Sequence, residues 1–370
     1  MGWLTGWSYR RPVTIDNTNN PNTLTDYQVL VVVDTASLIQ QGKMQADCDD
    51  IRFTDTDGTT LLPYWIEGPI NASNTKIWVK VPQIPANGTK VIYLYYGNPT
   101  AQSESSIVDT FIREIDGAQP VKLALPMDEG SGSTVYDQSG NNNNGTIYGA
   151  TWVTGRFGNA LSFDGIDDKV SIPDSPTLDG MTQLTIEAWV KPITLGAYKP
   201  VLAKWNSESD YSYWFGVHNQ SFWLQIFNAH VYTDSIIVAN NWQHLVTTWI
   251  ATQFPQSYVN GINRAVTYSS GWSSITSVRD TTAPVTLAWY SGAGGYYNVV
   301  IDEIRIYAKS LTSDEITDLY NYYGYTTPNY PGRVLVRKRI APEPITTVGN
   351  EETIAASPII VQRRMLIMSI

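Results

Sequence analysis

The chain has 370 residues and a formal net charge of −10, with 42% hydrophobic, 12% aromatic and only 16% charged residues. This length exceeds what one hydrophobic core usually serves, so we expect two domains. An acidic chain lacks the concentrated positive surface that phosphate backbones require, which argues against nucleic acid as a partner. Its apolar runs are too short to predict a membrane span.

Residues 1–110 alternate between strand patterns and turn signals. YQVLVVVD is a β-branched run typical of a buried strand, and KIWVKVPQI alternates between apolar and polar residues. Asp57-Gly58 predicts a hairpin, Asn87-Gly88 predicts another turn, and DTASLIQQGKM fits a short helix. Cys48 is the only cysteine and cannot form an intrachain disulfide. We interpret it as a small buried side chain, with a reactive or chain-bridging thiol as the alternative.

A family resemblance covers nearly all of this segment. GWSYRRPVTI, LTDYQVLVVVD, CDDIRFTDTDGTTLLPYWIE and IWVKVPQIPANGTKVIYLYYGNP together resemble a domain of unknown function. That domain often precedes laminin-G-like modules in archaeal and bacterial surface proteins and in some archaeal viruses. The resemblance implies a β-sandwich and a neighbouring module, but it implies no chemistry, because one fold hosts many functions.

Residues 111–122 resemble a linker, and residues 123–325 form the second predicted domain. Several of its stretches resemble the concanavalin-A-like, laminin-G-like sandwich: LALPMDEGSGSTVYDQSG, GRFGNALSFDG, NNWQHLVTTWI and VVIDEIRIYAKSLTSDEITDLY. The resemblance implies two large antiparallel sheets, with ligands often held at the rim or on the concave face. One helix is expected in SLTSDEITDLYNYYG, capped by Thr312 or Ser313 and ended by Gly324.

The tail, residues 326–370, is strand-like and basic, with prolines that interrupt it. Two interpretations stay open. In the first, its strands add to the edge of a sheet, either in a neighbouring copy or in the chain's own sandwich. Addition to a neighbouring copy would give self-assembly. Alternatively, they are strands of the first domain that return after a long excursion. The predicted fold class is all-β: a small β-sandwich, a concanavalin-A-like jelly roll and a strand-rich tail.

DQSGNNNNGT, residues 137–146, is too polar and too rich in glycine to build a core. Ca²⁺ binds roughly six to eight hard oxygens, and carboxylates, Asn side chains and the carbonyls of a glycine-rich loop supply such oxygens. We therefore predict a calcium site in this loop, formed by Asp137, Gly140, Asn141, Asn143 and Gly145. The alternative is a solvated turn in which the Asn and Asp side chains bond their own backbone.

Two acids outside the loop complete this prediction. The laminin-G-like family often binds calcium at the rim of the sandwich, so the resemblance implies Asp302, in VIDEIRIY, as a partner of Asp137. Asp128 in MDEGSG is a further candidate. The acids of FDGIDD, Asp164, Asp167 and Asp168, are interpreted as a tight turn, with a second metal site as the alternative.

The aromatic residues predict a second kind of site. Alternation in YSYWFGV and FWLQIF directs one set of side chains to the core: Tyr213, Phe215, Val217, Phe222, Leu224 and Ile226. Trp214 and Trp223 then lie on the other face, where flat rings can stack on the C–H faces of sugars. The predicted sugar platform comprises Trp205, Trp214, Trp223, Tyr296 and Tyr297. The alternative is that other parts of the sandwich simply bury these rings.

Catalysis has no support in the sequence, so we predict that the protein is not an enzyme. His218, His230 and His244 lack metal-ligand spacing, and neither a nucleophile elbow nor a phosphate-binding loop is present. Some laminin-G-like relatives are glycosidases with a Glu-x-Asp-x-x-Glu strand, and that pattern is absent.

We predict a non-catalytic adhesion protein that recognises glycans or a host surface, located outside the cell or on a virion. MGWLTGWSYRRP lacks the apolar core of a signal peptide, so either the numbering starts after processing or the protein leaves its cell by another route, for example in a virion. Together with the basic and apolar C-terminus, this favours a virion attachment or tail protein. Two alternatives stay open: a purely structural subunit of a virion or filament, and the carbohydrate-binding module of a secreted glycan-active enzyme.

Overall fold

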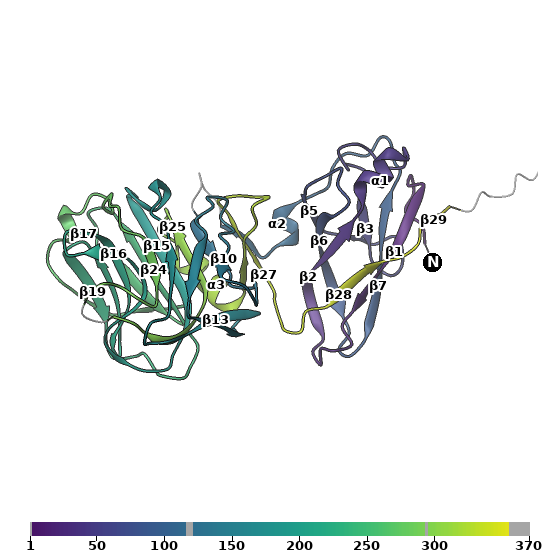
Figure 1. The fold of residues 1–370 in the computed structure, drawn as a ribbon. Coiled ribbons are helices and arrows are strands. Elements are labelled where there is room, and N and C mark those ends of the chain that lie inside the picture. The colour runs from purple at the N-terminus through teal and green to yellow at the C-terminus, as the bar shows by residue number, and fades with distance from the viewer. Residues whose placement is uncertain (1, 116–120, 293–294, 355–370) are drawn as a thin grey trace, which may run out of the picture. The chain divides into compact units, whose positions relative to one another are not determined.

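A computed structural model describes residues 2–115, 121–292 and 295–354 of the protein. The chain forms two compact units, one made of residues 1–106 with 344–370 and the other of residues 107–343 (Figure 1). Both consist mainly of antiparallel strands, which confirms the all-β fold class. This division differs from the predicted boundaries, because residues 111–122 contribute strands to the second unit and the tail is shared by both units. No helix in the described ranges is long and apolar enough to cross a membrane.

The first unit contains two antiparallel sheets. The six-stranded sheet has the order β28 (Ile345–Val348), β1 (Tyr9–Asp16), β7 (Thr89–Tyr96), β3 (Arg52–Thr54) and β4 (Leu61–Leu62), with β29 (Glu352–Thr353) also paired to β1. The three-stranded sheet has the order β2 (Leu24–Val33), β6 (Thr75–Ile84) and β5 (Tyr64–Gly68). The predicted short helix is α1 (Thr35–Gln40). It begins at Asp34, whose carboxylate accepts a hydrogen bond from the backbone N–H of Ser37.

Side chains of β2 and β6 contribute to the buried core of this unit. Cys48, which lies between α1 and β3 in the sequence, is also buried. Burial raises the pKa of the Cys48 thiol to about 11. The thiol is therefore protonated at neutral pH, and only the thiolate is strongly nucleophilic. The buried position agrees with the interpretation of Cys48 as a small core side chain.

The predicted turns have different roles. Asp57-Gly58 closes the hairpin of β3 and β4, in which Phe53 pairs with Leu62, as predicted. Asn87-Gly88 instead leads from β6 to β7, which belong to different sheets. A turn signal predicts where a strand ends, but it does not determine whether the next strand pairs with the previous one.

The described part of the tail forms strands within this chain. β28 and β29 run antiparallel to β1 at the edge of the six-stranded sheet (Figure 1, yellow beside purple), with Val348 opposite Val13 and Thr353 opposite Tyr9. These residues therefore follow the second interpretation of the tail, in which its strands return to the first domain. The apolar end SPIIVQRRMLIMSI, residues 357–370, lies outside the described residues.

The second unit contains two large antiparallel sheets and one small sheet. The nine-stranded sheet has the order β10 (Thr134–Val135), β11 (Gly145–Tyr148), β14 (Lys169–Ile172), β24 (Val285–Leu287), β16 (Gly196–Ser207), β17 (Asp210–Asn219), β18 (Ser221–Ile226), β19 (Ala229–Thr233) and β23 (Val266–Tyr268). The eight-stranded sheet has the order β12 (Thr151–Thr154), β13 (Asn159–Asp164), β25 (Asn298–Tyr307), β15 (Gln183–Pro192), β20 (Gln243–Ile250), β21 (Gln256–Val259) and β22 (Ile262–Arg264), with β9 (Val121–Leu125) paired to β25. The small sheet has the order β26 (Tyr323–Tyr325), β27 (Val334–Arg337) and β8 (Arg113–Ile115). Short helices at Ile107–Thr110 (α2), Pro176–Leu178 (η1) and Trp272–Ser274 (η2) lie between strands.

The two large sheets share one hydrophobic core, to which β13, β15 and β25 contribute from one side and β16, β17 and β18 from the other. The alternation prediction for β17 and β18 is confirmed, because its core set lies in this cluster: Tyr213, Phe215, Val217, Phe222, Leu224 and Ile226. The side chains between them therefore lie on the opposite face of the nine-stranded sheet.

Helix α3 (Ser313–Asn321) packs on the other face of the eight-stranded sheet together with the small sheet. Thr312 caps it as predicted: its hydroxyl accepts from Glu315 N–H, and the Glu315 carboxylate accepts from Thr312 N–H. Ile316 and Leu319 are buried against this layer. The helix ends at Asn321, before the predicted stop, because Gly324 lies within β26.

Candidate functional site

The asparagine-rich loop is organised around the buried carboxylate of Asp137. Its Oδ1 accepts hydrogen bonds from the backbone N–H groups of Ala124 and Ser139, both at 2.9 Å. Its Oδ2 accepts from the Ser139 hydroxyl at 2.8 Å and from Asn143 N–H at 2.9 Å. Four hydrogen bonds therefore engage both oxygens of this one carboxylate.

The asparagines next to Asp137 donate to strand β9. The Asn141 amide donates to the carbonyls of Val121 and Lys122, each at 3.2 Å, and the Asn143 amide donates to Lys122 at 2.9 Å. Asn144 Oδ1 accepts from Asp137 N–H at 2.8 Å. These contacts correspond to the alternative reading of the loop, a turn in which Asn and Asp side chains satisfy backbone groups.

The two glycines of the predicted calcium set have packing roles. Gly140 has a φ of +88°, and a Cβ there would lie 2.6 Å from Pro331. Gly145 lies in β11, where a Cβ would lie 2.5 Å from the side chain of Val170. Both positions are closed to larger residues, so the glycines are explained without a ligand.

Asp302 and Asp128 belong to a different group of residues from Asp137. Asp302 Oδ2 accepts from the backbone N–H groups of Arg156 and Phe157, at 2.8 and 2.9 Å. Asp128 accepts from Asn159 N–H and pairs with Arg339, whose Nη1 lies 3.0 Å from Asp128 Oδ2. Burial, together with the nearby charge of Asp128, raises the pKa of Asp302 to about 8, although the two backbone hydrogen bonds and the charge of Arg339 partly offset the shift.

A bulge in β25 lies next to Asp302. β15 and β25 lose register between the pairs Glu187–Arg305 and Trp189–Asp302, and Glu303 in the bulge has a φ of +54°. A bulge of this kind redirects side chains, and a non-glycine residue with positive φ is uncommon in a strand. Strain at such a position often marks a functional or specifically stabilised site.

The predicted calcium ligands thus form two groups, which share no hydrogen-bond partner within the part of the chain that the structure describes. A calcium shell needs carboxylate and carbonyl oxygens that converge and are free to coordinate. The Asp137 carboxylate already accepts four hydrogen bonds, and the Asp128 carboxylate is paired with the Arg339 guanidinium. As arranged, these residues do not fit one shared calcium site, and calcium binding stays a prediction.

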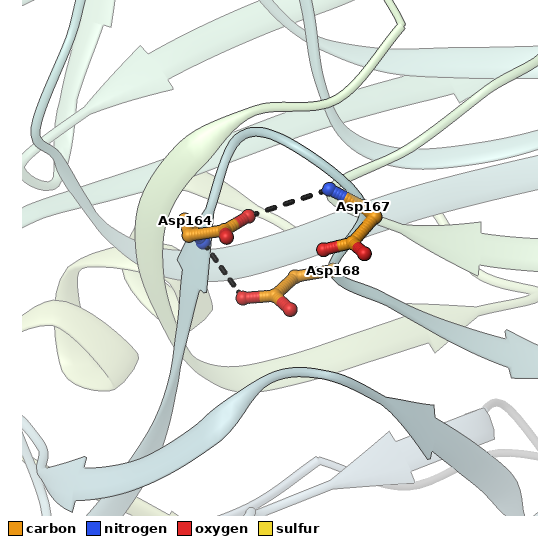
Figure 2. Close-up of side chains that lie close together, drawn as sticks. All are labelled: Asp164, Asp167 and Asp168. Carbon is orange, nitrogen blue, oxygen red and sulfur yellow. Dashed lines mark hydrogen bonds between the residues drawn. The ribbon is translucent and has the colours of Figure 1, made fainter.

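The acids of FDGIDD lie at the turn between β13 and β14, and Figure 2 shows their carboxylates close together. One oxygen from each of Asp164, Asp167 and Asp168 lies within 4.8 Å of the others. Asp164 accepts from Asp167 N–H at 3.4 Å and from Ile166 N–H at 2.7 Å, and Asp168 accepts from Asp164 N–H at 2.8 Å. These bonds match the predicted tight turn.

An aromatic pocket opens on the face of the nine-stranded sheet that is turned away from the core. Its volume is about 320 Å³, and its lining comprises Tyr198, Trp205, Glu208, Trp214, Trp223, Gln225 and Tyr290. This size is at the lower end of the roughly 300–1,000 Å³ typical of small-molecule sites. All three predicted tryptophans line the pocket, so the structure brings them together as the alternation implies.

The rings of the pocket are held by other rings. Trp205 stacks on Tyr211 with centroids 4.0 Å apart, and Tyr290 meets Trp205 and Trp214 edge-on. Trp205 and Trp214 are only 6% and 4% exposed, whereas Trp223 is half-buried and Tyr198 is 44% exposed. Trp223 and Tyr198 therefore offer the accessible aromatic surface, and the other rings fix its shape.

Polar groups in the pocket supply hydrogen-bonding capacity. The indole N–H groups of Trp205, Trp214 and Trp223 are buried and have no acceptor among the described residues. The same holds for two core tryptophans, Trp249 and Trp272, so a missing acceptor alone does not identify a site. The polar groups that the pocket lining offers are therefore the side chains of Gln225 and Glu208.

The two predicted tyrosines lie elsewhere. Tyr297 is fully buried in the hydrophobic core between the large sheets, so its assignment to the sugar platform is corrected. The reason is local: Tyr297 precedes β25, and its backbone N–H bonds to the carbonyl of Ala288, which turns the ring inward. Tyr296 is half-buried beside Trp289, with ring centroids 6.0 Å apart, and does not line the pocket.

Sequence reasoning missed Tyr198, Glu208 and Tyr290 as pocket residues. They come from β16, the β16–β17 turn and the segment after β24, which the alternation of β17 and β18 does not reach. Gln225 was within reach of that argument, since it follows Trp223 by two residues on the same face of β18.

A largely buried carboxyl group, that of Asp179, makes stability depend on pH. Lys204 is fully buried on β16, is hydrogen-bonded to Asp174 and lies 3.2 Å from Asp179. Burial raises the pKa of Asp179 to about 6, although Lys204 partly offsets the shift.

The sign of the pH effect follows from that shift. A carboxyl whose folded pKa is raised contributes stability below its unfolded value of 3.8, and that stability is lost as pH rises through about 6. Between pH 4 and pH 7, the free energy of unfolding should fall less in Asp179→Asn than in the wild type. The difference between the two decreases should be at most about 3 kcal/mol. Urea titrations at both pH values measure this. An equal pH dependence in both proteins would contradict it, and exposed Asp16→Asn is the control.

Comparison with known proteins agrees with the architecture. Residues 47–124 match the family model for a domain of unknown function, DUF2341, and residues 164–317 match the concanavalin A-like lectin/glucanases superfamily. No curated protein matches the chain.

Solved structures resemble it at low identity. The binding domain of Paraclostridial Mosquitocidal Protein 1 is 16% identical, with a TM-score of 0.45 over 55% of this chain and 52% of that one. Domain 4 of AbnA, a GH43 extracellular arabinanase from Geobacillus stearothermophilus in complex with arabinotriose, is 20% identical, with a TM-score of 0.42 over 54% of this chain and 98% of that one. The chain spans about half the length of the mosquitocidal domain. From the two family matches, the chain carries a DUF2341 domain followed by a concanavalin A-like lectin/glucanase domain, in the order that the sequence predicts.

Proposed function

We propose that the second unit binds glycans without catalysis, through the aromatic pocket on its nine-stranded sheet. The observation that carries this proposal is the lining, in which five aromatic side chains stand beside one amide and one carboxylate. Aromatic surface packs against the C–H groups of a sugar ring, while amide and carboxylate groups bind its hydroxyls. The superfamily to which residues 164–317 match includes lectins, which supports the same function.

The lining also supports binding over hydrolysis. Most glycosidases use two carboxyl groups, about 5–9.5 Å apart, on either side of the bond that breaks. Among the residues that line the pocket, Glu208 is the one carboxylate. A single exposed acid suits recognition of hydroxyl groups and leaves no partner to act as nucleophile or second base.

A glycan array followed by calorimetric titration with the best-bound sugar tests the proposal. We expect Trp223→Ala to weaken binding at least tenfold, about 1.4 kcal/mol, because the half-buried indole supplies accessible contact surface. Tyr198→Ala, at a more exposed position, should weaken binding without loss of folding.

The matched control is Phe254→Ala. Phe254 is an aromatic residue of the same unit, 60% exposed and outside the pocket, so its removal should leave affinity unchanged. Melting temperatures of all variants separate loss of binding from loss of folding. The proposal would be contradicted if no glycan on the array bound, or if the Trp223 and Tyr198 variants bound with the same affinity as the wild type.

We further propose that this binding serves adhesion at a virion or cell surface, where the protein is a component of the exposed layer. Immunogold labelling of intact particles and cells tests the location. Self-assembly through the tail stays a prediction for residues 355–370, since the described tail strands pair with β1 of their own chain. Removal of these residues should dissociate oligomers if the tail joins neighbouring copies.

A further inference from the structure

Two buried carboxylates beside the β25 bulge each leave an oxygen without a partner. Asp302 is fully buried, and its Oδ1 has no hydrogen-bond partner among the described residues, whereas its Oδ2 accepts two backbone N–H groups. Glu303 is also buried: one oxygen binds Arg305, and Oε1 has no partner in the same part of the chain. Buried acceptors that lack a donor or a cation are costly, so this place favours a positive charge.

Arg339 brings such a charge to the site. Its Nη1 and Nη2 lie 3.0 and 3.4 Å from the two oxygens of Asp128, and its Nε lies 3.0 Å from Glu343. The guanidinium lies 4.4 Å from the ring centroid of Tyr323, and the Arg339 side chain is mostly buried. Two carboxylates and an aromatic face therefore hold one planar cation, which suits the fork of arginine better than a point charge.

The loop at residues 155–158 closes around both acids and the arginine. A Cβ on Gly158 would lie 2.0 Å from Asp128 Oδ1 and 2.7 Å from Arg339 Nη2. A Cβ on Gly155 would lie 2.6 Å from Asp302 Oδ2. One short loop therefore approaches Asp128, Asp302 and Arg339, although Asp128 precedes the other two by more than 170 residues in sequence.

We propose that Arg339 is a built-in counter-cation, which pairs with Asp128 beside the buried Asp302 and so excludes a divalent cation from these two acids. Without the guanidinium, the site would offer the carboxylate oxygens of Asp128 and the unpartnered oxygen of Asp302. That set is the hard-oxygen chemistry that Ca²⁺ takes. The chain thus supplies its own cation to Asp128, whereas Asp137 belongs to the separate group described above.

Thermal melting with EDTA and with about 5 mM CaCl₂ tests whether the Arg339 guanidinium excludes calcium. This concentration is high enough to occupy a weak calcium site. The wild type should melt at the same temperature in both. Arg339→Gln should melt lower than the wild type in EDTA and should recover at least half of the loss in CaCl₂. The double variant Arg339→Gln with Asp302→Asn should lose the recovery.

Two further measurements keep the proposal open to refutation. Arg333→Gln removes another arginine ion pair of the second unit, with Glu114, and should show no calcium response. If Arg339→Gln does not fold, calorimetric titration of the wild type with CaCl₂ decides, and no binding is expected. Calcium binding by the wild type that Asp302→Asn abolishes, or an Arg339→Gln variant that is indifferent to calcium, would overturn the proposal.

Discussion

Replacement of Arg305 by methionine is expected to lower the free energy of unfolding by about 3–5 kcal/mol. Arg305 is almost fully buried, and its guanidinium binds Glu303, the carbonyl of Gly324 and, at 3.3 Å, Glu187. Burial alone would raise the pKa of Glu187, but Arg305 and His244 hold it below its ordinary value. Without the guanidinium, two carboxylates stay buried with no arginine to offset their charge.

Chemical denaturation at pH 7 measures this loss, and Lys309→Met is the matched control. Lys309 forms a partly exposed ion pair with Glu315, 2.7 Å apart, whose removal should cost less than about 1 kcal/mol. The loss caused by Arg305→Met should shrink at pH 5, because protonation removes the uncompensated charges. A loss of similar size in both variants would show that the Arg305 network stabilises the fold no more than a surface pair does.

The sequence predicted those parts of the fold that depend on neighbouring residues. Alternation in β17 and β18 separates core residues from the pocket tryptophans, because successive side chains of a strand point to opposite faces. The Thr312 cap and the Asp57-Gly58 hairpin between β3 and β4 are equally local. Each of these features is decided within a few residues, and each is present in the structure.

Features that depend on long-range contacts were not predictable in this way. The pairing of Asp128 with Arg339 joins residues of the second unit that lie far apart in sequence, and nothing near either residue specifies the other. The bulge at Glu303 changes the direction of side chains within a strand that reads as regular. For the same reason Asp302 was assigned to Asp137, although the two have separate partners.

Replacement of Asp137 by alanine is expected to cost about 3–5 kcal/mol, because it removes the acceptor for several buried donors at once. The backbone N–H groups of Ala124, Ser139 and Asn143 would lose their partner. The loop would also release β9, since Asn141 and Asn143 bind the carbonyls of this strand only when the turn is closed. Urea denaturation at pH 7 measures the change.

Asn142→Gly is the matched control for Asp137→Ala. Asn142 is exposed in the same loop with a φ of +59°, a conformation that glycine adopts freely, so we expect a change within about 0.5 kcal/mol. Calcium separates the two readings of the loop. If the turn is purely hydrogen-bonded, EDTA leaves the wild type unchanged and Asp137→Ala is equally destabilised with and without calcium. If calcium stabilises the wild type and Asp137→Ala abolishes that gain, the loop is a metal site and the hydrogen-bond account of its stability is wrong.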